Sequence, residues 1–360
     1  MLEIKRRKTS VVFVGKVPVG GEHPVAVQSM TNTDTRDAAA TLAQVKALAA
    51  AGCEIVRVAV PDEAAAAALA EICAGSPVPI IADIHFDHRL AIMAAENGAA
   101  GLRINPGNIG SRAKVREVVA AAKDRGLCIR VGVNAGSLEK GLVEKFGGPT
   151  AGAMVESALG HIDFIRSLDF HNMKVSLKAS SVLKTIEAHR LLAQRTDLPF
   201  HVGLTEAGTP VTGAVKSAVG LGILFFEGMG DTVRVSLSGD PIPEVRTAYT
   251  ILRALGIRRR GPDIIACPTC GRTEMDAAGL ALKVEEAVRN MTAPLTIAVM
   301  GCVVNGPGEA READLGVAGG RGTGILFKRG NVVAKFAESE LYDRLMAEIE
   351  ALEREYIRTS

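Results

Sequence analysis

Eight short runs of aliphatic and β-branched residues alternate with alanine-rich segments over the first two-thirds of the chain. The alanine-rich segments have helical periodicity, and strands that alternate with helices are typical of βα units in a parallel sheet. The predicted strands are Pro24–Thr31, Glu54–Val60, Val78–His85, Gly101–Asn105, Leu127–Asn134, Met173–Ser180, Pro199–Glu206 and Thr232–Ser238. Eight such units match the size of a closed (β/α)₈ TIM barrel of roughly 250 residues, the α/β fold that we expect here.

An open, doubly wound sheet is the competing architecture for the same alternation. Such sheets commonly carry a glycine-rich dinucleotide-binding loop after the first strand. The sequence at that point, Ser29–Asp37, is SMTNTDTRD and lacks such a loop. The closed barrel is therefore the preferred prediction.

The last hundred or so residues follow a different pattern, beyond a basic linker at Ile257–Asp263. Strands are predicted at Ile264–Ala266, Leu295–Met300, Gly324–Lys328 and Val332–Phe336, and helices at Met275–Asn290 and Ser339–Tyr356. This mixture indicates a small α+β domain. We therefore predict a barrel domain at 1–258 and a second domain at 259–360.

The composition excludes several functional classes. Lys and Arg total 42 against 40 Asp and Glu, so the chain is not a general binder of nucleic acid or of membrane surfaces. Aromatic residues are 4% with no Trp, which leaves few platforms for stacking bases. No apolar run approaches the length of a membrane helix or of a secretory signal. The six cysteines are unevenly spread, so we expect a reducing, cytoplasmic location.

Five predicted strands carry a cation between apolar neighbours. Because side chains alternate along a strand, the apolar neighbours would pack against the helices and the cations would point into the barrel. The residues two positions further on are small or polar, as Asn134 and Ser236 are. The five cations are Arg57, Arg103, Arg130, Lys178 and Arg234.

Few acidic residues are placed to neutralise these cations. Asp83 faces inward with His85, and Glu206, at the end of the seventh strand, is the second candidate. Five cations less two carboxylates leave a local surplus of +3. Buried charge needs a partner, so the sequence predicts an anion of diphosphate size at the carboxyl ends of the strands. The alternative is an internal ion network that merely holds the barrel together.

Three cysteines of the second domain have the spacing of a metal site. Cys267 and Cys270 form a CPTC motif at a strand end, and Cys302 follows the next strand. Three thiolates at loop tips suggest a metal ion or an iron–sulfur cluster. No His follows His201, and Glu309 is the first carboxylate after Cys302. The alternatives for these three cysteines are a zinc site or thiols that are simply buried in the core. Cys53, Cys73 and Cys128 are isolated in the sequence and are predicted to be core thiols.

Three motifs together resemble the 4-hydroxy-3-methylbut-2-enyl diphosphate synthase family of the non-mevalonate isoprenoid pathway. They are VQSMTNTDT at Val27–Thr35, CPTCGR at Cys267–Arg272 and GCVVNGPGEA at Gly301–Ala310. The resemblance covers essentially the whole chain, in the bacterial two-domain form. It implies reductive ring opening and dehydration of 2-C-methyl-D-erythritol 2,4-cyclodiphosphate with two electrons. It also implies that the second domain holds a 4Fe–4S cluster.

The resemblance further implies roles for particular residues. The cluster ligands would be Cys267, Cys270, Cys302 and Glu309. Glu206 would be the catalytic carboxylate that handles a proton beside the iron, where Glu309 also belongs to the catalytic machinery. The substrate contacts would be Arg57, Arg103, Arg130, Asn134, Lys178, Arg234 and Ser236, with assistance from Asp83 and His85.

Family members are homodimers in which the cluster domain of one subunit caps the barrel of the other, and ferredoxin or flavodoxin supplies the electrons. Two other functions remain as alternatives. A pterin-type synthase would use the barrel and leave the three clustered cysteines unexplained. An electron carrier or zinc-stabilised binding protein would use the cysteines and leave the five inward cations unexplained.

Overall fold

The computed structural model describes residues 3–302, 308 and 311–359. The chain divides into two compact units, Met1–Arg258 and Arg259–Ser360. No helix among the described residues is both long and apolar enough to cross a membrane.

The first unit is the predicted TIM barrel. Its parallel strands are hydrogen-bonded in the order β8-β7-β6-β5-β4-β3-β10-β9. A parallel bridge between Val175 and Phe200 joins β8 to the segment that leads into β9, so the ring is nearly closed. The strands are β3 Ala26–Met30, β4 Ile55–Ala59, β5 Ile80–Ile84, β6 Gly101–Ile104, β7 Cys128–Asn134, β8 Met173–Lys178, β9 His201–Val202 and β10 Thr232–Val233.

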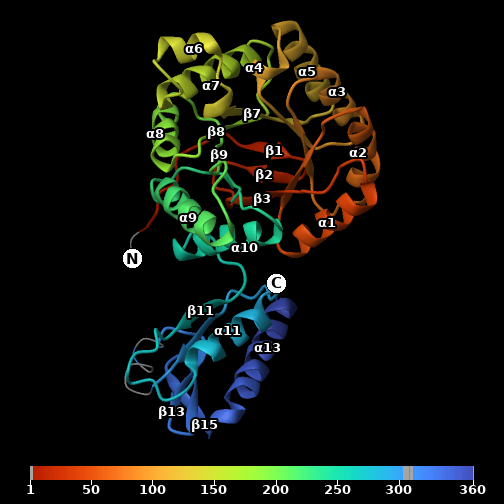
Figure 1. Ribbon diagram of the computed structural model, residues 1–360. Coiled ribbons are helices and arrows are strands. Elements are labelled where there is room, and N and C mark those ends of the chain that lie inside the picture. Colours follow the sequence, from red (N-terminus) through yellow and green to blue (C-terminus); the bar gives the residue numbers. More distant parts are fainter. Residues whose placement is uncertain (1–2, 303–307, 309–310, 360) are drawn as a thin grey trace. The chain divides into compact units, whose positions relative to one another are not determined.

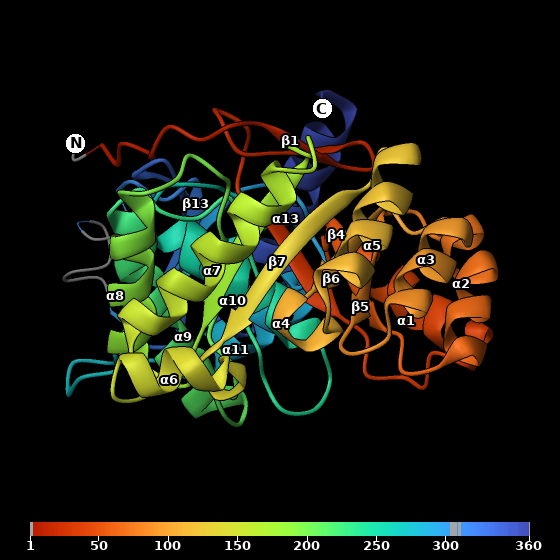
Figure 2. The same cartoon turned by 90° about the horizontal axis from the view of Figure 1, so that it is seen from above.

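Helices surround this ring of strands (Figure 1). Figure 2 shows β7 running between α5 and α7, and both helices contact it. Shorter elements, α4 Pro106–Ile109, η1 Ala135–Ser137 and α6 Lys140–Lys145, occupy the connections on either side of β7. The outer helices are α1 Ala38–Ala50, α2 Glu63–Gly75, α3 His88–Glu96, α5 Arg112–Asp124, α7 Ala151–Arg166, α8 Val182–Ala193, α9 Pro210–Phe226 and α10 Ile242–Ala254.

Local sequence explains where several of these helices begin. Asp37, Asp62 and Asp87 precede α1, α2 and α3, and each carboxylate accepts a hydrogen bond from a backbone N–H of the first turn. At the starts of α7 and α8, the hydroxyl groups of Thr150 and Ser181 each accept a hydrogen bond from a backbone N–H of the first turn. Such caps satisfy N–H groups that have no partner within the helix, and a carboxylate also suits the positive end of the helix dipole.

A hairpin that the sequence analysis did not predict packs at the amino-terminal end of the barrel strands. It consists of β1 Val12–Val14 and β2 Val17–Val19, joined at Gly15 with φ +58°. Its valines pack against residues near the starts of β3, β4, β5 and β7, namely Ala26, Ile55, Ile81 and Cys128. The hairpin therefore fills the amino-terminal end of the barrel interior with apolar side chains.

The second unit is the predicted α+β domain, with a five-stranded sheet. Strands β11, β12 and β13 are parallel, and β13, β14 and β15 are antiparallel. β13 was not predicted, because its sequence, LGVAGG, is poor in β-branched residues. The elements are β11 Asp263–Ala266, α11 Ala277–Val288, β12 Thr296–Met300, β13 Leu315–Gly320, β14 Thr323–Lys328, β15 Asn331–Ala337, η2 Glu338–Glu340 and α13 Leu341–Thr359.

Candidate functional site

A pocket opens at the carboxyl ends of the barrel strands. The apolar neighbours of the inward cations join the core under the helices, as Ile129 and Val131 do on either side of Arg130. All nine residues that the sequence analysis assigned to substrate contact line this pocket. The lining is Arg57, Asp83, His85, Arg103, Arg130, Asn134, Ser176, Lys178, Leu204, Thr205, Arg234 and Ser236.

Asp83 anchors one side of the pocket and is 5% exposed. Its Oδ1 accepts a hydrogen bond from Nη1 of Arg103 at 3.2 Å, and its Oδ2 lies 3.7 Å from Nε of Arg57 and 3.4 Å from Nε2 of His85. Burial opposes ionisation of this carboxyl, but Arg57, the His85 hydrogen bond and Arg103 together hold its pKa below the usual range. Asp83 is therefore ionised and orients two of the five cations.

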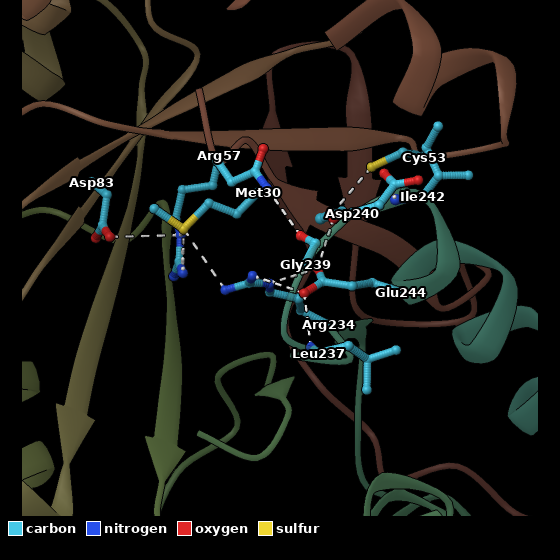
Figure 3. Close-up of polar contacts among 12 residues, drawn as sticks. Met30, Cys53, Arg57, Asp83, Arg234, Leu237, Gly239, Asp240, Ile242 and Glu244 are labelled. Atoms are coloured by element: carbon cyan, nitrogen blue, oxygen red, sulfur yellow. Dashed lines mark hydrogen bonds and ion pairs between the residues drawn. The ribbon is translucent and has the colours of Figure 1, made fainter. Parts of the chain in front are cut away.

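Glu244, in the first turn of α10, anchors the opposite side (Figure 3). It is 2% exposed and accepts hydrogen bonds from both Nε and Nη2 of Arg234, each at 3.1 Å. The hydroxyl of Ser29 and the backbone N–H of Leu237 donate to it at 2.8 and 3.0 Å. No role was predicted for Glu244 from the sequence. The available signal was a lone carboxylate at the start of the helix that follows the Arg234 strand.

The thioether of Met30 lies between two of the guanidinium groups (Figure 3). Arg57 donates to its Sδ from Nε and Nη2 at 3.1 and 2.9 Å, and Nη1 of Arg234 lies at 3.7 Å. Sulfur is a weak acceptor, so these contacts hold the arginines in place without neutralising them.

The remaining cations are poorly neutralised. Arg130 is 1% exposed, and its Nε and Nη1 have no hydrogen-bond partner among the described residues. Burial, followed by the repulsion of Arg57 and Arg103, holds its pKa well below the ordinary value. Burial and the repulsion of Arg130 do the same to Lys178, and burial lowers the pKa of Arg57 to about 10. These pKa values fall chiefly because burial disfavours the charged form, and the neighbouring cations add to the effect.

Five cations against Asp83 and Glu244 leave a formal surplus of +3 in the part of the pocket that the structure describes. The predicted surplus is therefore present, although Glu244 rather than Glu206 provides the second carboxylate. Ion networks that serve only stability are usually balanced, and this one is not. The arrangement is suited to binding a multiply charged anion.

Two glycines make room for the cations inside the barrel. A Cβ atom at Gly132 would lie 2.7 Å from Nε of Arg103, and one at Gly203 would lie 2.9 Å from Nζ of Lys178. Real Cβ atoms do not approach other atoms so closely. Any larger residue at these positions would therefore displace the charged groups that line the pocket.

Glu206 lies outside this lining. Its side chain is exposed, and its own backbone has a left-handed conformation, with φ +53°. The short β9 ends at Val202, so the alternation of a regular strand does not extend to Glu206. Its neighbours Leu204 and Thr205 line the pocket instead.

In the second unit, the predicted ligand cysteines lie on two neighbouring loops. Cys267 follows β11 and Cys302 follows β12, and these strands are parallel neighbours, so their carboxyl ends meet at one edge of the sheet. The N–H of Glu274 donates to the carbonyl of Gly301 at 2.9 Å and ties the two loops together. Cys270 is exposed, and Cys302 is 7% exposed.

The chemistry of these thiols fits metal ligation. Backbone hydrogen bonds from Gly301, Thr269 and Cys270, with the charge of Arg272, lower the pKa of Cys267 and favour its thiolate, the form that binds metals. Glu309 lies outside the described residues. Within the described part of the chain, no three His, Cys, Asp or Glu side chains are already assembled around a point that a metal ion could occupy.

The other cysteines are core thiols, as predicted. Cys53 and Cys128 are buried and Cys73 is partly buried. Burial raises the pKa of Cys53 and Cys73 to about 12 and that of Cys128 to about 11. These thiols are therefore neutral near pH 7 and poor metal ligands.

Comparison with solved structures supports the barrel architecture. The dihydropteroate synthase of Stenotrophomonas maltophilia is 15% identical, with a TM-score of 0.50 over 68% of this chain and 98% of that one. At this identity the similarity shows the fold alone.

Comparison with sequence families is more specific. The GcpE TIM-barrel domain matches residues 9–249, and the GcpE protein C-terminal domain matches residues 263–351. The 4-hydroxy-3-methylbut-2-en-1-yl diphosphate synthase (flavodoxin) of Maridesulfovibrio salexigens is 61% identical over 98% of this chain and 99% of its own length. That of Geobacter sulfurreducens is 60% identical over 96% of this chain and 98% of its own length. The chain therefore belongs to the GcpE family of 4-hydroxy-3-methylbut-2-en-1-yl diphosphate synthases.

Proposed function

We propose that this chain converts 2-C-methyl-D-erythritol 2,4-cyclodiphosphate to 4-hydroxy-3-methylbut-2-enyl diphosphate, an isoprenoid precursor. The reaction is a reductive ring opening and dehydration that consumes two electrons. The observation that carries this proposal is the barrel pocket, in which five cations face two carboxylates. A cyclic diphosphate supplies the missing negative charge, and the identity to relatives of that name supports this reaction.

The barrel residues bind and orient this substrate. Arg57, Arg103, Arg130, Lys178 and Arg234 hold the diphosphate oxygens, and guanidinium groups suit this because they donate two parallel hydrogen bonds. Asn134 and Ser236 contact the substrate hydroxyl groups, with His85 assisting at the same rim. Asp83 and Glu244 hold three of the arginines in place, and Asp83, which lines the pocket, also assists in substrate binding with His85.

We propose that Cys267, Cys270, Cys302 and Glu309 hold a 4Fe–4S cluster. The support is the pair of neighbouring loops that carry the three thiols, together with the lowered pKa of Cys267. When bound, the cluster supplies electrons and an iron that acts as a Lewis acid. A carboxylate from Glu309 is a harder and more readily exchanged ligand than a thiolate. Glu206, exposed beside the pocket rim, is the proposed carboxylate that handles a proton.

The electron donor that we propose is flavodoxin, which the names of the relatives specify, with ferredoxin as the alternative. We place the protein in the cytoplasm. All six cysteines are free thiols, which suits a reducing compartment.

Anaerobic purification tests the cluster. We expect a brown protein with about four irons per chain. Cys302→Ser should lose most of the iron and nearly all activity, because one of three thiolate ligands is removed. Cys73→Ser is the matched control and should keep both its iron and its activity.

In Glu309→Ala, impaired iron retention or turnover is expected. A colourless, zinc-containing wild type with full activity would contradict the proposal.

We further propose a homodimer in which the cluster domain of one subunit caps the barrel of its partner. An apolar ridge on the outer face of α9 supports self-association. Val211, Val215, Val219 and Phe226 are 77, 62, 53 and 53% exposed, and Leu183 on the neighbouring α8 is 76% exposed. Exposed apolar residues in a continuous row commonly mark a protein interface.

Val215→Lys tests whether this ridge is the interface. A charge at the centre of the ridge should dissociate the dimer, because an unpaired lysine is costly to bury. Sedimentation velocity on the wild type and the variant measures this. Phe13→Lys, a comparably exposed apolar position on β1 at the amino-terminal end of the barrel, is the control and should stay dimeric. A monomeric wild type, or a variant that remains dimeric, would show that this assignment is wrong.

A further inference from the structure

Lys174 is a buried lysine on the inner face of the barrel, outside the pocket lining. On β8, the outward residues Val175 and Leu177 join the core beneath the helices. Ser176 and Lys178 point inward and line the pocket. Lys174 precedes Ser176 by two positions and shares its face, because side chains alternate along a strand. Its ammonium group therefore lies inside the barrel, next to the pocket floor.

Within the described part of the chain, no carboxylate is paired with this ammonium. Lys174 is 0% exposed, and its Nζ has no hydrogen-bond partner among the described residues. The residue opposite it on β7 is Arg130, which is itself a cation. Cys128, on the same strand, and His201, on β9, also face it. Burial raises the pKa of the Cys128 thiol to about 11 and holds the pKa of the His201 imidazole well below its ordinary value, so both groups are neutral near pH 7.

The carboxylate whose charge reaches Lys174 is that of Asp231. This carboxylate is already engaged with other groups. Its Oδ1 accepts hydrogen bonds from Arg6 and Thr9, and its Oδ2 accepts one from the backbone N–H of Phe200. Lys174 therefore lacks a dedicated counter-ion.

This arrangement lowers the stability of the ligand-free protein. Burial lowers the pKa of Lys174 to about 8, from 10.5 for a free lysine. The destabilisation is complete below about pH 8 and disappears as the pH rises towards 10.5. Valine, isoleucine and leucine usually fill the interior of such barrels and would avoid this loss. A buried cation at this position must therefore have a use other than stability.

We propose that Lys174 is a positioning residue whose charge attracts the anion in the pocket above it. It does not touch the anion, because Arg130 and Ser176 line the pocket and Lys174 does not. The positive charge of Lys174 acts on the anion through the water-free interior of the barrel, where charges interact more strongly than in water. The anion in turn keeps Lys174 protonated. This inference rests on the proposed function, because it requires a diphosphate in the pocket.

Lys174→Met tests this role, with inorganic pyrophosphate as the probe. At pH 7 we expect calorimetry to show pyrophosphate affinity roughly tenfold weaker than in the wild type. The ligand-free variant should melt at a higher temperature, because a buried charge has gone. Near pH 9 the difference in affinity should shrink, because the wild-type lysine then loses its proton in the ligand-free protein. Pyrophosphate gains negative charge over the same pH range, so the wild type and the variant are compared at each pH.

Lys46→Met is the matched control, because it removes the same charge from the exposed face of α1. It should change neither affinity nor melting temperature appreciably. Lys174→Gln, a second neutral variant, should show the same loss of affinity as Lys174→Met. The inference is overturned if both Lys174 variants bind pyrophosphate as the control does, or if they melt below the wild type. A wild type that binds no pyrophosphate would overturn the proposed function as well.

Discussion

Methionine in place of Arg130 should weaken pyrophosphate binding about a hundredfold and also stabilise the ligand-free protein. Arg130 lines the pocket, is 1% exposed, and leaves its Nε and Nη1 without partners among the described residues. A charge-assisted contact to phosphate lost in a dry site corresponds to roughly 3 kcal/mol, or about a hundredfold in affinity. Removing an unneutralised buried cation should raise the free energy of unfolding by roughly 1–3 kcal/mol.

Titration calorimetry and thermal unfolding measure these two changes on the same samples. Arg116→Met, on the exposed surface of α5, removes one positive charge without touching the pocket. This control should shift neither quantity by much. If Arg130→Met loses stability and keeps its affinity, Arg130 is a structural residue and the pocket is not built for an anion.

Alanine in place of Glu244 should lower the free energy of unfolding by roughly 3–5 kcal/mol, the usual effect of breaking a buried ion pair. The substitution leaves Arg234 without its carboxylate and removes the acceptor of Ser29 and of the Leu237 N–H. Saturating pyrophosphate should restore part of this loss, because the anion replaces the missing negative charge and binds only the folded state.

Chemical denaturation with and without pyrophosphate checks this expectation. Glu227→Ala is the matched control. Glu227 pairs with Arg190 in a partly exposed ion pair, and such pairs contribute about 1 kcal/mol or less. If Glu244→Ala proves no more destabilising than Glu227→Ala, Glu244 does not hold Arg234 in the way that the structure indicates.

The inward direction of the cations could be predicted from the sequence because it depends on local geometry. Arg130 lies between Ile129 and Val131, and alternation along a strand puts the flanking aliphatics on one face and the arginine on the other. The same rule does not apply to Glu206, because β9 ends at Val202 and Glu206 has a positive φ. A prediction from alternation holds only as far as the strand continues.

The contribution of Glu244 could not be predicted in this way. Its carboxylate reaches Arg234 from helix α10, and it reaches Ser29 across 215 positions of sequence. Only the closure of the barrel brings these groups together. The hairpin β1–β2 was missed for a related reason, since its valines have no recognisable partners until the strands form a ring.

The number and order of the βα units, the surplus of positive charge and the family could all be predicted from the sequence, because each depends on residue type, spacing or local alternation. The pairing of carboxylates with arginines followed only from the folded chain. So did the lack of partners, among the described residues, for Nε and Nη1 of Arg130 and for Nζ of Lys174. Electrostatic interactions act across space, between residues that folding brings together from distant parts of the chain.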